Sequence, residues 1–300
     1  MGKTASKEPG GKRVKRPRFH IIDNAPGAEW RRVNLKKLRS RVEAQVEAKR
    51  QSRLRRTFNW RSIYLVPVLI AWTGLLCIPA IFSVIFLRKT NAYDRVEQLW
   101  TRSVHALAGA RIQVSGAEHL DPTRTYIILS NHASHLDITA LIQTTTMPIR
   151  FFARENLFKI PLFGWYLSMT GHIPIDRHKG ATNFDKLRTD CEKLVARRHS
   201  ILVFPEGTRS LTTEMLPFKK GAFHVAQQLG FPILPVSIHG SHHCHPAKTY
   251  IFRKGEIRLT FHEPIDPNGC DVETLVTRTR AVIASGLVDE APDLRHVVNG

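Results

Sequence analysis

Apolar residues follow two alternating patterns along most of this chain. Short apolar runs of four to six residues, which indicate buried strands, are separated by longer stretches in which apolar positions recur at helical spacing. This alternation predicts an α/β fold, with a mostly parallel central sheet and helices on both faces. The expected strands are 111–115, 126–130, 149–153, 172–175, 201–204, 233–238 and 256–261, and the expected helices are 91–109, 134–143, 162–169, 182–198, 221–229 and 271–285.

One apolar run is long enough to cross a bilayer. Residues 63–87 contain no charged side chain, and as a helix they would extend about 37 Å at about 1.5 Å per residue. Pro67, Gly74 and Pro79 interrupt the run, so two arrangements are open. One is a single span. The other, which we favour, is a pair of short helices that bend near Gly74 and enter and leave one leaflet.

The positive charge is concentrated before this run. The formal net charge is +20, and residues 1–61 contain nineteen Lys and Arg against five Asp and Glu, hence +14. We expect residues 1–18 to be disordered and residues 28–56 to form a basic helix, either on a membrane surface or solvated and partly disordered. A tail of this kind can bind nucleic acid or anionic lipid. Because it adjoins an apolar run, we expect anionic membrane lipids and no nucleic acid.

Polar strings follow directly on two of the predicted strands. The string NHASHLD occupies residues 131–137, and FPEGTRS occupies residues 204–210. Because α/β proteins place their sites at the carboxyl ends of parallel strands, we expect both strings on one rim of the sheet. Asp137 would lie about one turn into the following helix, where its carboxylate can orient the imidazole of His132. A histidine held in this way is suited to take a proton near neutral pH.

These strings, together with GHIPIDR at residues 171–177 and ILPVSI at residues 233–238, resemble four signature blocks of the glycerolipid acyltransferases. The resemblance is nearest to the 1-acyl-glycerol-3-phosphate acyltransferases. It covers roughly residues 90–285 and implies a membrane-associated enzyme. Such an enzyme transfers an acyl group from acyl-CoA or acyl-carrier protein to the sn-2 hydroxyl of lysophosphatidate, giving phosphatidate.

Two kinds of alternative are open. The acceptor can be another lysophospholipid, glycerol-3-phosphate or an aminolipid. From a different class, the chain can be a non-catalytic basic membrane tether. On the acyltransferase reading, the chain divides into a basic tail (residues 1–61), a membrane segment (residues 62–89) and a catalytic domain (residues 90–300). Because the acyl donors are cytoplasmic, we expect the catalytic domain on the cytoplasmic side.

The resemblance implies a general-base mechanism. His132, paired with Asp137, takes the proton of the acceptor hydroxyl as that oxygen attacks the thioester. Because a thioester is already activated, no covalent serine intermediate is required, and neither Ser134 nor Ser210 lies in a G-x-S-x-G turn. We expect backbone amides near His132 to stabilise the oxyanion.

The second string is the expected phosphate site. Gly207 lets the backbone approach an anion, Thr208 offers a hydroxyl, and Arg209 offers a charged fork that matches phosphate. Glu206 would repel phosphate, so we expect it to orient Arg209 or to bind the glycerol hydroxyls.

Three further cations are candidates. The resemblance implies that Arg177 is a second phosphate-binding arginine, Lys219 can add positive potential, and Arg154 follows another strand. The aromatic-rich segment 151–166 is either an acyl-chain tunnel or ordinary core.

We expect neither a metal nor an organic cofactor. The four cysteines lie far apart, which argues against a disulfide framework and for a reducing compartment. The tempting cluster at residues 242–245 consists of adjacent ligands on a short loop, which cannot easily close a tetrahedron.

Overall fold

The computed structural model describes residues 60–87, 92–145, 147–175, 184–211 and 214–287. The predictions for the basic tail up to residue 59 and for Arg177 therefore lie outside the described residues.

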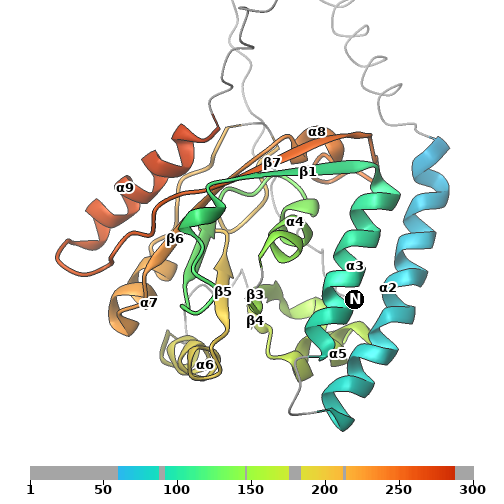
Figure 1. The fold of residues 1–300 in the computed structure, drawn as a ribbon, viewed down its shortest axis with the longest axis horizontal. Helices are drawn as coiled ribbons and strands as arrows, with labels where there is room; N and C mark the ends of the chain where they lie inside the picture. Colours follow the sequence, from blue (N-terminus) through green and yellow to red (C-terminus); the bar gives the residue numbers. More distant parts are fainter. Residues whose placement is uncertain (1–59, 88–91, 146, 176–183, 212–213, 288–300) are drawn as a thin grey trace, which may run out of the picture. The chain divides into compact units, whose positions relative to one another are not determined.

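A seven-stranded sheet forms the centre of the described chain (Figure 1). Its order is β1-β7-β6-β2-β5-β3-β4, and all neighbouring pairs are parallel except β6 and β7, which are antiparallel. This confirms the predicted α/β fold with a mostly parallel sheet. The strands are β1 Ala110–Ser115, β2 Ile127–Ser130, β3 Ile149–Arg154, β4 Ile173–Ile175, β5 Ser200–Val203, β6 Ile233–His239 and β7 Gly255–Phe261.

Helices cover both faces of this sheet, as the alternating pattern predicts (Figure 1). The α-helices are α2 Trp60–Phe86, α3 Ala92–Ala108, α4 Leu136–Thr144, α5 Phe163–Thr170, α6 Phe184–Ala196, α7 Gly221–Leu229, α8 Ser241–Cys244 and α9 Val272–Ser285; two 3-10 turns are η1 Ala117–His119 and η2 Glu155–Lys159. Successive residues of β2 point to opposite faces: Ile128 packs with α3 and α4, whereas Ile127 and Leu129 pack with α6, α7 and α9. Strands buried on both faces therefore read as continuous apolar runs.

The apolar run forms one unbroken helix, α2, so the predicted bend at Gly74 is wrong. The reason is that a stripe of α2 packs against α3. Near the expected bend, Trp100 Nε1 donates to Thr73 Oγ1 at 2.9 Å and Trp72 Nε1 donates to Ser103 Oγ at 2.6 Å. Among the described residues, α2 is the one helix that is long and apolar enough to cross a bilayer by length and composition.

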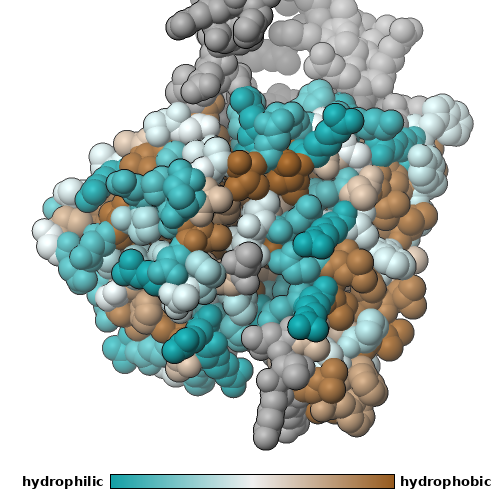
Figure 2. All heavy atoms as spheres, viewed as in Figure 1, coloured by the Kyte–Doolittle hydropathy of each residue, from teal (hydrophilic) through white to brown (hydrophobic). Residues whose placement is uncertain are grey.

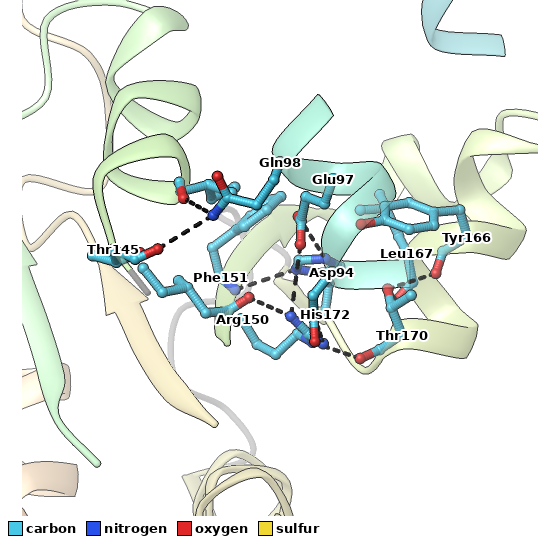
Figure 3. A network of polar contacts seen from close by, with 12 residues as sticks. Asp94, Glu97, Gln98, Thr145, Arg150, Phe151, Tyr166, Leu167, Thr170 and His172 are labelled. Atoms are coloured by element: carbon cyan, nitrogen blue, oxygen red, sulfur yellow. Dashed lines mark hydrogen bonds and ion pairs between the residues drawn. The ribbon is translucent and has the colours of Figure 1, made fainter. Parts of the chain in front are cut away.

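A buried polar cluster fastens α3 to the sheet (Figure 3). Arg150 on β3 is fully buried, and its guanidinium donates to Asp94 Oδ1 at 3.0 Å and to the Thr170 carbonyl at 2.7 Å. Glu97 Oε2 lies 3.8 Å from Arg150 Nη1, and Glu97 Oε1 lies 3.8 Å from His172 Nε2. Because a buried charge requires partners, this cluster fixes the position of α3 on the domain.

Candidate functional site

The two polar strings meet because β2 and β5 are parallel neighbours in register, with Leu129 paired to Val203. The polypeptide therefore leaves both strands at the same edge of the sheet. Directly after β2, the side chain of Asn131 acts as a backbone mimic: its Nδ2 donates to the Ile238 carbonyl and its Oδ1 accepts from the Ile238 amide, both at 2.8 Å. This pair of bonds extends the contact between β2 and β6 and fixes the chain just before His132.

His132 and Asp137 are in direct contact. His132 Nδ1 lies 2.8 Å from Asp137 Oδ2, and both residues are buried. The imidazole stacks on the Phe204 ring, with centroids 3.9 Å apart and planes at 15°. A carboxylate on Nδ1 favours the tautomer in which Nδ1 carries the hydrogen, which leaves Nε2 as a proton acceptor.

The same carboxylate oxygen organises the turn into α4. Asp137 Oδ2 also accepts from the backbone amides of Ala133 and Ser134, each at 2.8 Å. The amide of His132 donates instead to Glu206 Oε1 at 2.7 Å. These amides bind carboxylates, so the expectation that they serve as oxyanion donors is not met by this arrangement.

Glu206 connects the two strings. Its second oxygen accepts from the Leu216 amide at 2.9 Å, so both carboxylate oxygens bind backbone N–H groups. Burial raises the pKa of this carboxyl, although the two amide donors oppose the change. The carboxylate thus braces the histidine turn against the segment that leads to α7.

Gly207 and Lys219 lie against each other. Gly207 has φ +70°, in the left-handed region, and a Cβ at this position would lie 3.0 Å from Lys219 Nζ. The Lys219 amide donates to the Pro205 carbonyl at 2.8 Å. The Lys219 ammonium group therefore lies beside this turn, where the positive φ of residue 207 favours glycine. Thr208 beside it is exposed.

Arg154 ends β3 and Arg209 lies in the loop after β5, and the two charges influence each other. Arg209 is half-buried, and its pKa is lowered by burial and by the charge of Arg154, while Asp137 raises it. Arg154 is exposed at the end of β3. Two neighbouring guanidinium groups beside a buried histidine make an electropositive rim that attracts an anion.

Comparison with known proteins identifies the family of this chain. Residues 111–239 match the family model described as Acyltransferase. A 1-acyl-sn-glycerol-3-phosphate acyltransferase of Chlamydomonas reinhardtii is 31% identical over 73% of this chain and 68% of its own length. The human 1-acyl-sn-glycerol-3-phosphate acyltransferase alpha is 30% identical over 70% of this chain and 75% of its own length. The chain belongs to this acyltransferase family.

A solved structure shares the fold of this acyltransferase. The crystal structure of the 1-acyl-sn-glycerophosphate acyltransferase from Thermotoga maritima superposes with a TM-score of 0.67, covering 78% of this chain and 95% of the other, at 24% identity. A 1-acyl-sn-glycerol-3-phosphate acyltransferase of Saccharomyces cerevisiae is 36% identical over 53% of this chain and 53% of its own length. The chain is an enzyme, which removes the non-catalytic tether as an alternative.

Ser134 and Ser210, the two serines near His132 that could act as nucleophiles instead, both donate hydrogen bonds to main-chain carbonyls. Ser134 Oγ donates to the His245 carbonyl at 2.8 Å, and Ser210 Oγ donates to the Glu214 carbonyl at 2.7 Å. Both residues are buried. Hydroxyls that donate to main-chain carbonyls are poorly placed to act as nucleophiles.

A stack of rings beside the site was not foreseen from the sequence. The His245 ring stacks with those of His135 and Phe252, with centroids 5.8 Å and 4.3 Å away. His245 Nδ1 contacts the Ile251 carbonyl at 2.9 Å, and burial lowers the pKa of its imidazole. One histidine of the segment 242–245, which was not expected to bind a metal, thus packs in the site wall. His135, in the string 131–137, and the histidines at residues 242–245 are both visible in the sequence. The spacing of apolar residues does not reveal that their rings stack.

Proposed function

We propose that this enzyme transfers a fatty acyl group from acyl-CoA or acyl-carrier protein to the sn-2 hydroxyl of 1-acyl-sn-glycerol-3-phosphate, giving phosphatidate. The observation that carries the proposal is the buried contact of 2.8 Å between His132 Nδ1 and Asp137 Oδ2, beside two arginines. The printed names of the relatives support the choice of acceptor.

In this mechanism His132 Nε2 accepts the proton of the acceptor hydroxyl while that oxygen attacks the thioester carbonyl. Asp137 stabilises the imidazolium that forms. When the tetrahedral intermediate collapses, the carbon–sulfur bond breaks and the imidazolium returns its proton to the departing thiolate. The thioester supplies its own activation, so the reaction requires no metal or organic cofactor.

The electropositive rim is the proposed phosphate site. Arg209 and Arg154 bind the phosphate oxygens, and Lys219 and Thr208 contribute a charge and a hydroxyl from the neighbouring turn. We assign Glu206 the bracing role that its two amide contacts support, and Arg177 the second phosphate contact that the family resemblance implies. A site with this charge disfavours zwitterionic head groups.

The enzyme is proposed to associate with a membrane, with its catalytic domain on the cytoplasmic side. The apolar helix α2 supports membrane association. The cytoplasmic side follows from where the two acyl donors are found, and anionic lipids are the proposed partners of the basic residues 1–61.

The test is release of free thiol from a long-chain acyl-CoA by the detergent-solubilised protein, with and without lysophosphatidate. Wild type should release thiol only when the acceptor is present. His132→Ala should reduce that release roughly 10²- to 10⁴-fold, since a general base contributes about that much. His119→Ala serves as a control, since His119 lies in η1 after the C-terminal end of β1, and β1 runs opposite to β2, which places η1 at the other edge of the sheet.

Acceptor-dependent release that survives in His132→Ala would disprove the mechanism. Faster turnover of glycerol-3-phosphate or a zwitterionic lysolipid than of lysophosphatidate would disprove the assigned acceptor.

A further inference from the structure

A second exposed apolar surface lies beside α2. Ile160, Trp165 and Met169 are 46%, 59% and 39% exposed, and all three are in α5 or in the turn before it. The opposite side of α5 is buried against α2, since Tyr166 and Leu167 share a core cluster with residues of that helix. Figure 2 shows hydrophobic surface in the area of α2 and α5. Large apolar patches of this kind mark contact surfaces.

The turn before α5 is fixed, so these side chains have defined positions. The Gly164 amide donates to the Ile160 carbonyl at 2.7 Å. A Cβ at Gly164 would collide with the Phe158 carbonyl oxygen, which shows how closely η2 and α5 pack. Trp165 and Met169 are one helical turn apart and lie on the same side of α5.

The catalytic domain contacts α2 along most of the length of the helix. Near its N-terminal end, the Phe252 amide donates to Ser62 Oγ at 2.9 Å and Arg61 Nη2 donates to the Leu107 carbonyl at 2.6 Å. About 27 Å further along, at about 1.5 Å per residue, Ala80 lies in the core cluster that includes α5. The helix cannot leave the domain to cross a bilayer without losing these contacts.

Perpendicular insertion of α2 together with the domain is also unfavourable. Arg95 and Arg102 are exposed on α3, which packs against α2. Each arginine carried to the bilayer centre costs about 2.5–3.5 kcal/mol or more. An α2 axis close to the membrane plane avoids this cost while its exposed apolar side chains enter the interface.

We propose that Ile160, Trp165 and Met169 form a second bilayer contact, which with α2 makes a single docking face lying flat on the membrane. The occupant is the lipid interface because α5 packs directly against α2, whose exposed side chains are almost all apolar. Tryptophan is also the residue that favours the boundary between head groups and acyl chains. The inference rests on the proposed membrane association and extends it to α5.

This docking face adjoins the proposed phosphate site. Arg154 ends β3, η2 begins at the next residue, and Ile160 follows η2 directly. A lysophospholipid lying in the leaflet beside α5 is therefore a short distance from the arginines that bind its phosphate. The acceptor reaches the site laterally, without leaving the membrane.

The test is flotation of the full-length protein with phosphatidylcholine vesicles. Neutral lipid is chosen so that attraction between the basic N-terminal residues and anionic lipid does not mask the effect. The triple variant Ile160→Ser, Trp165→Ser, Met169→Ser should bind at least about tenfold more weakly than wild type, since three apolar side chains lose their burial in lipid. The matched control is Val114→Ser, at a position 43% exposed on β1, the edge strand farthest from β4 in the sheet order.

Activity separates docking from chemistry. The triple variant should lose activity toward long-chain lysophosphatidate presented in vesicles, but it should act like wild type on a short-chain, monomeric lysophosphatidate in solution. If wild type is inactive on both acceptors while vesicle binding still depends on α5, the proposed function fails and the docking face stands.

Equal vesicle binding by the triple variant and Val114→Ser would overturn the proposal. So would a change in the oligomeric size of the detergent-solubilised triple variant with unchanged vesicle binding, because the face would then belong to a second copy. Loss of activity on the short-chain acceptor as well would show that the substitutions damage the site itself.

Discussion

At the scale of single residues, Glu206 has a position that its sequence context does not suggest. It lies in the string that was expected to bind phosphate, yet its two oxygens accept from the amides of His132 and Leu216. A carboxylate is the one side chain of this size that can accept both bonds without offering a hydrogen. Its two contacts hold the turn that carries His132.

We therefore expect Glu206→Gln to impair turnover more than acceptor binding. The amide NH₂ of glutamine would face one of the two backbone N–H groups, and leaving such a donor unsatisfied costs about 1–3 kcal/mol. Steady-state kinetics should show a lower kcat, a lower melting temperature and little change in KM for lysophosphatidate. Glu214→Gln, an exposed carboxylate in the following segment, is the control. A rise in KM alone would instead assign Glu206 to the acceptor.

Arg209→Lys tests the phosphate site directly. The substitution keeps the charge and loses the planar fork, so KM for lysophosphatidate should rise about 10- to 100-fold, as expected when a hydrogen bond between charged groups is lost. The control is to measure kcat/KM for both lysophosphatidate and lysophosphatidylcholine. The ratio of the two values, which expresses the preference for the phosphomonoester, should be smaller in the variant than in wild type. An unchanged KM with a reduced kcat would place Arg209 outside the phosphate site.

At the scale of elements, the sheet and its helices could be predicted because apolar runs such as residues 127–129 in β2 are buried on both faces. The antiparallel pairing of β6 and β7 could not, since a strand's own pattern carries no information about its neighbour's direction. The prediction of a bend at Gly74 was wrong for a similar reason. It was argued from residues of α2 alone, whereas Trp100 of α3 contacts α2 at that position.

The candidate site divides in the same way. Contact between His132 and Asp137 follows from local spacing on a strand-to-helix turn, so the sequence suffices. The proximity of Arg154 to Arg209 requires that β3 and β5 be neighbours, which depends on the whole sheet order. The cluster around Arg150 joins α3, β3 and α5, and each of its residues reads as an isolated polar position in the sequence.

That cluster makes the stability of the α3 contact depend on pH. Burial raises the pKa of Glu97 from its ordinary value of 4.5 to about 7, although Arg150 opposes the change. Between these values the folded protein keeps a proton that the unfolded chain has released. The stability that this proton contributes is complete below pH 4.5 and is lost as the pH rises through about 7.

Glu97→Gln should remove this dependence. Between pH 5 and pH 8 the melting temperature of the detergent-solubilised variant should rise relative to that of wild type, by an amount corresponding to about 3 kcal/mol at most, because the other titrating groups are the same in both proteins. Glu256→Gln, which alters an exposed carboxylate on β7, should leave the wild-type pH dependence in place. Identical pH profiles for wild type and Glu97→Gln would refute the assignment.

At the scale of the whole molecule, α2 is part of the catalytic domain's core. Ala80 is 2% exposed within the cluster that includes Tyr166, whereas Ile78, two residues earlier, is 54% exposed. Ala80→Leu should overpack this contact and destabilise the domain by about 1–3 kcal/mol, lowering the melting temperature in detergent by several degrees. Ile78→Leu introduces the same side chain on the outer face and should change little. Equal melting temperatures for the two variants would mean that α2 does not pack as described.

The sheet order also determines when the fold can be completed during synthesis. Strand β1 pairs only with β7 within the described chain, so Ala110 cannot form its pair until Gly255 has been synthesised. While the ribosome makes the intervening residues, β1 remains an unpaired edge beside the apolar α2. Pairing over such a sequence separation is slow and leaves the nascent chain open to aggregation. A membrane that receives α2 early would shelter this intermediate, so the helix that we propose docks the finished enzyme can also protect the unfinished one.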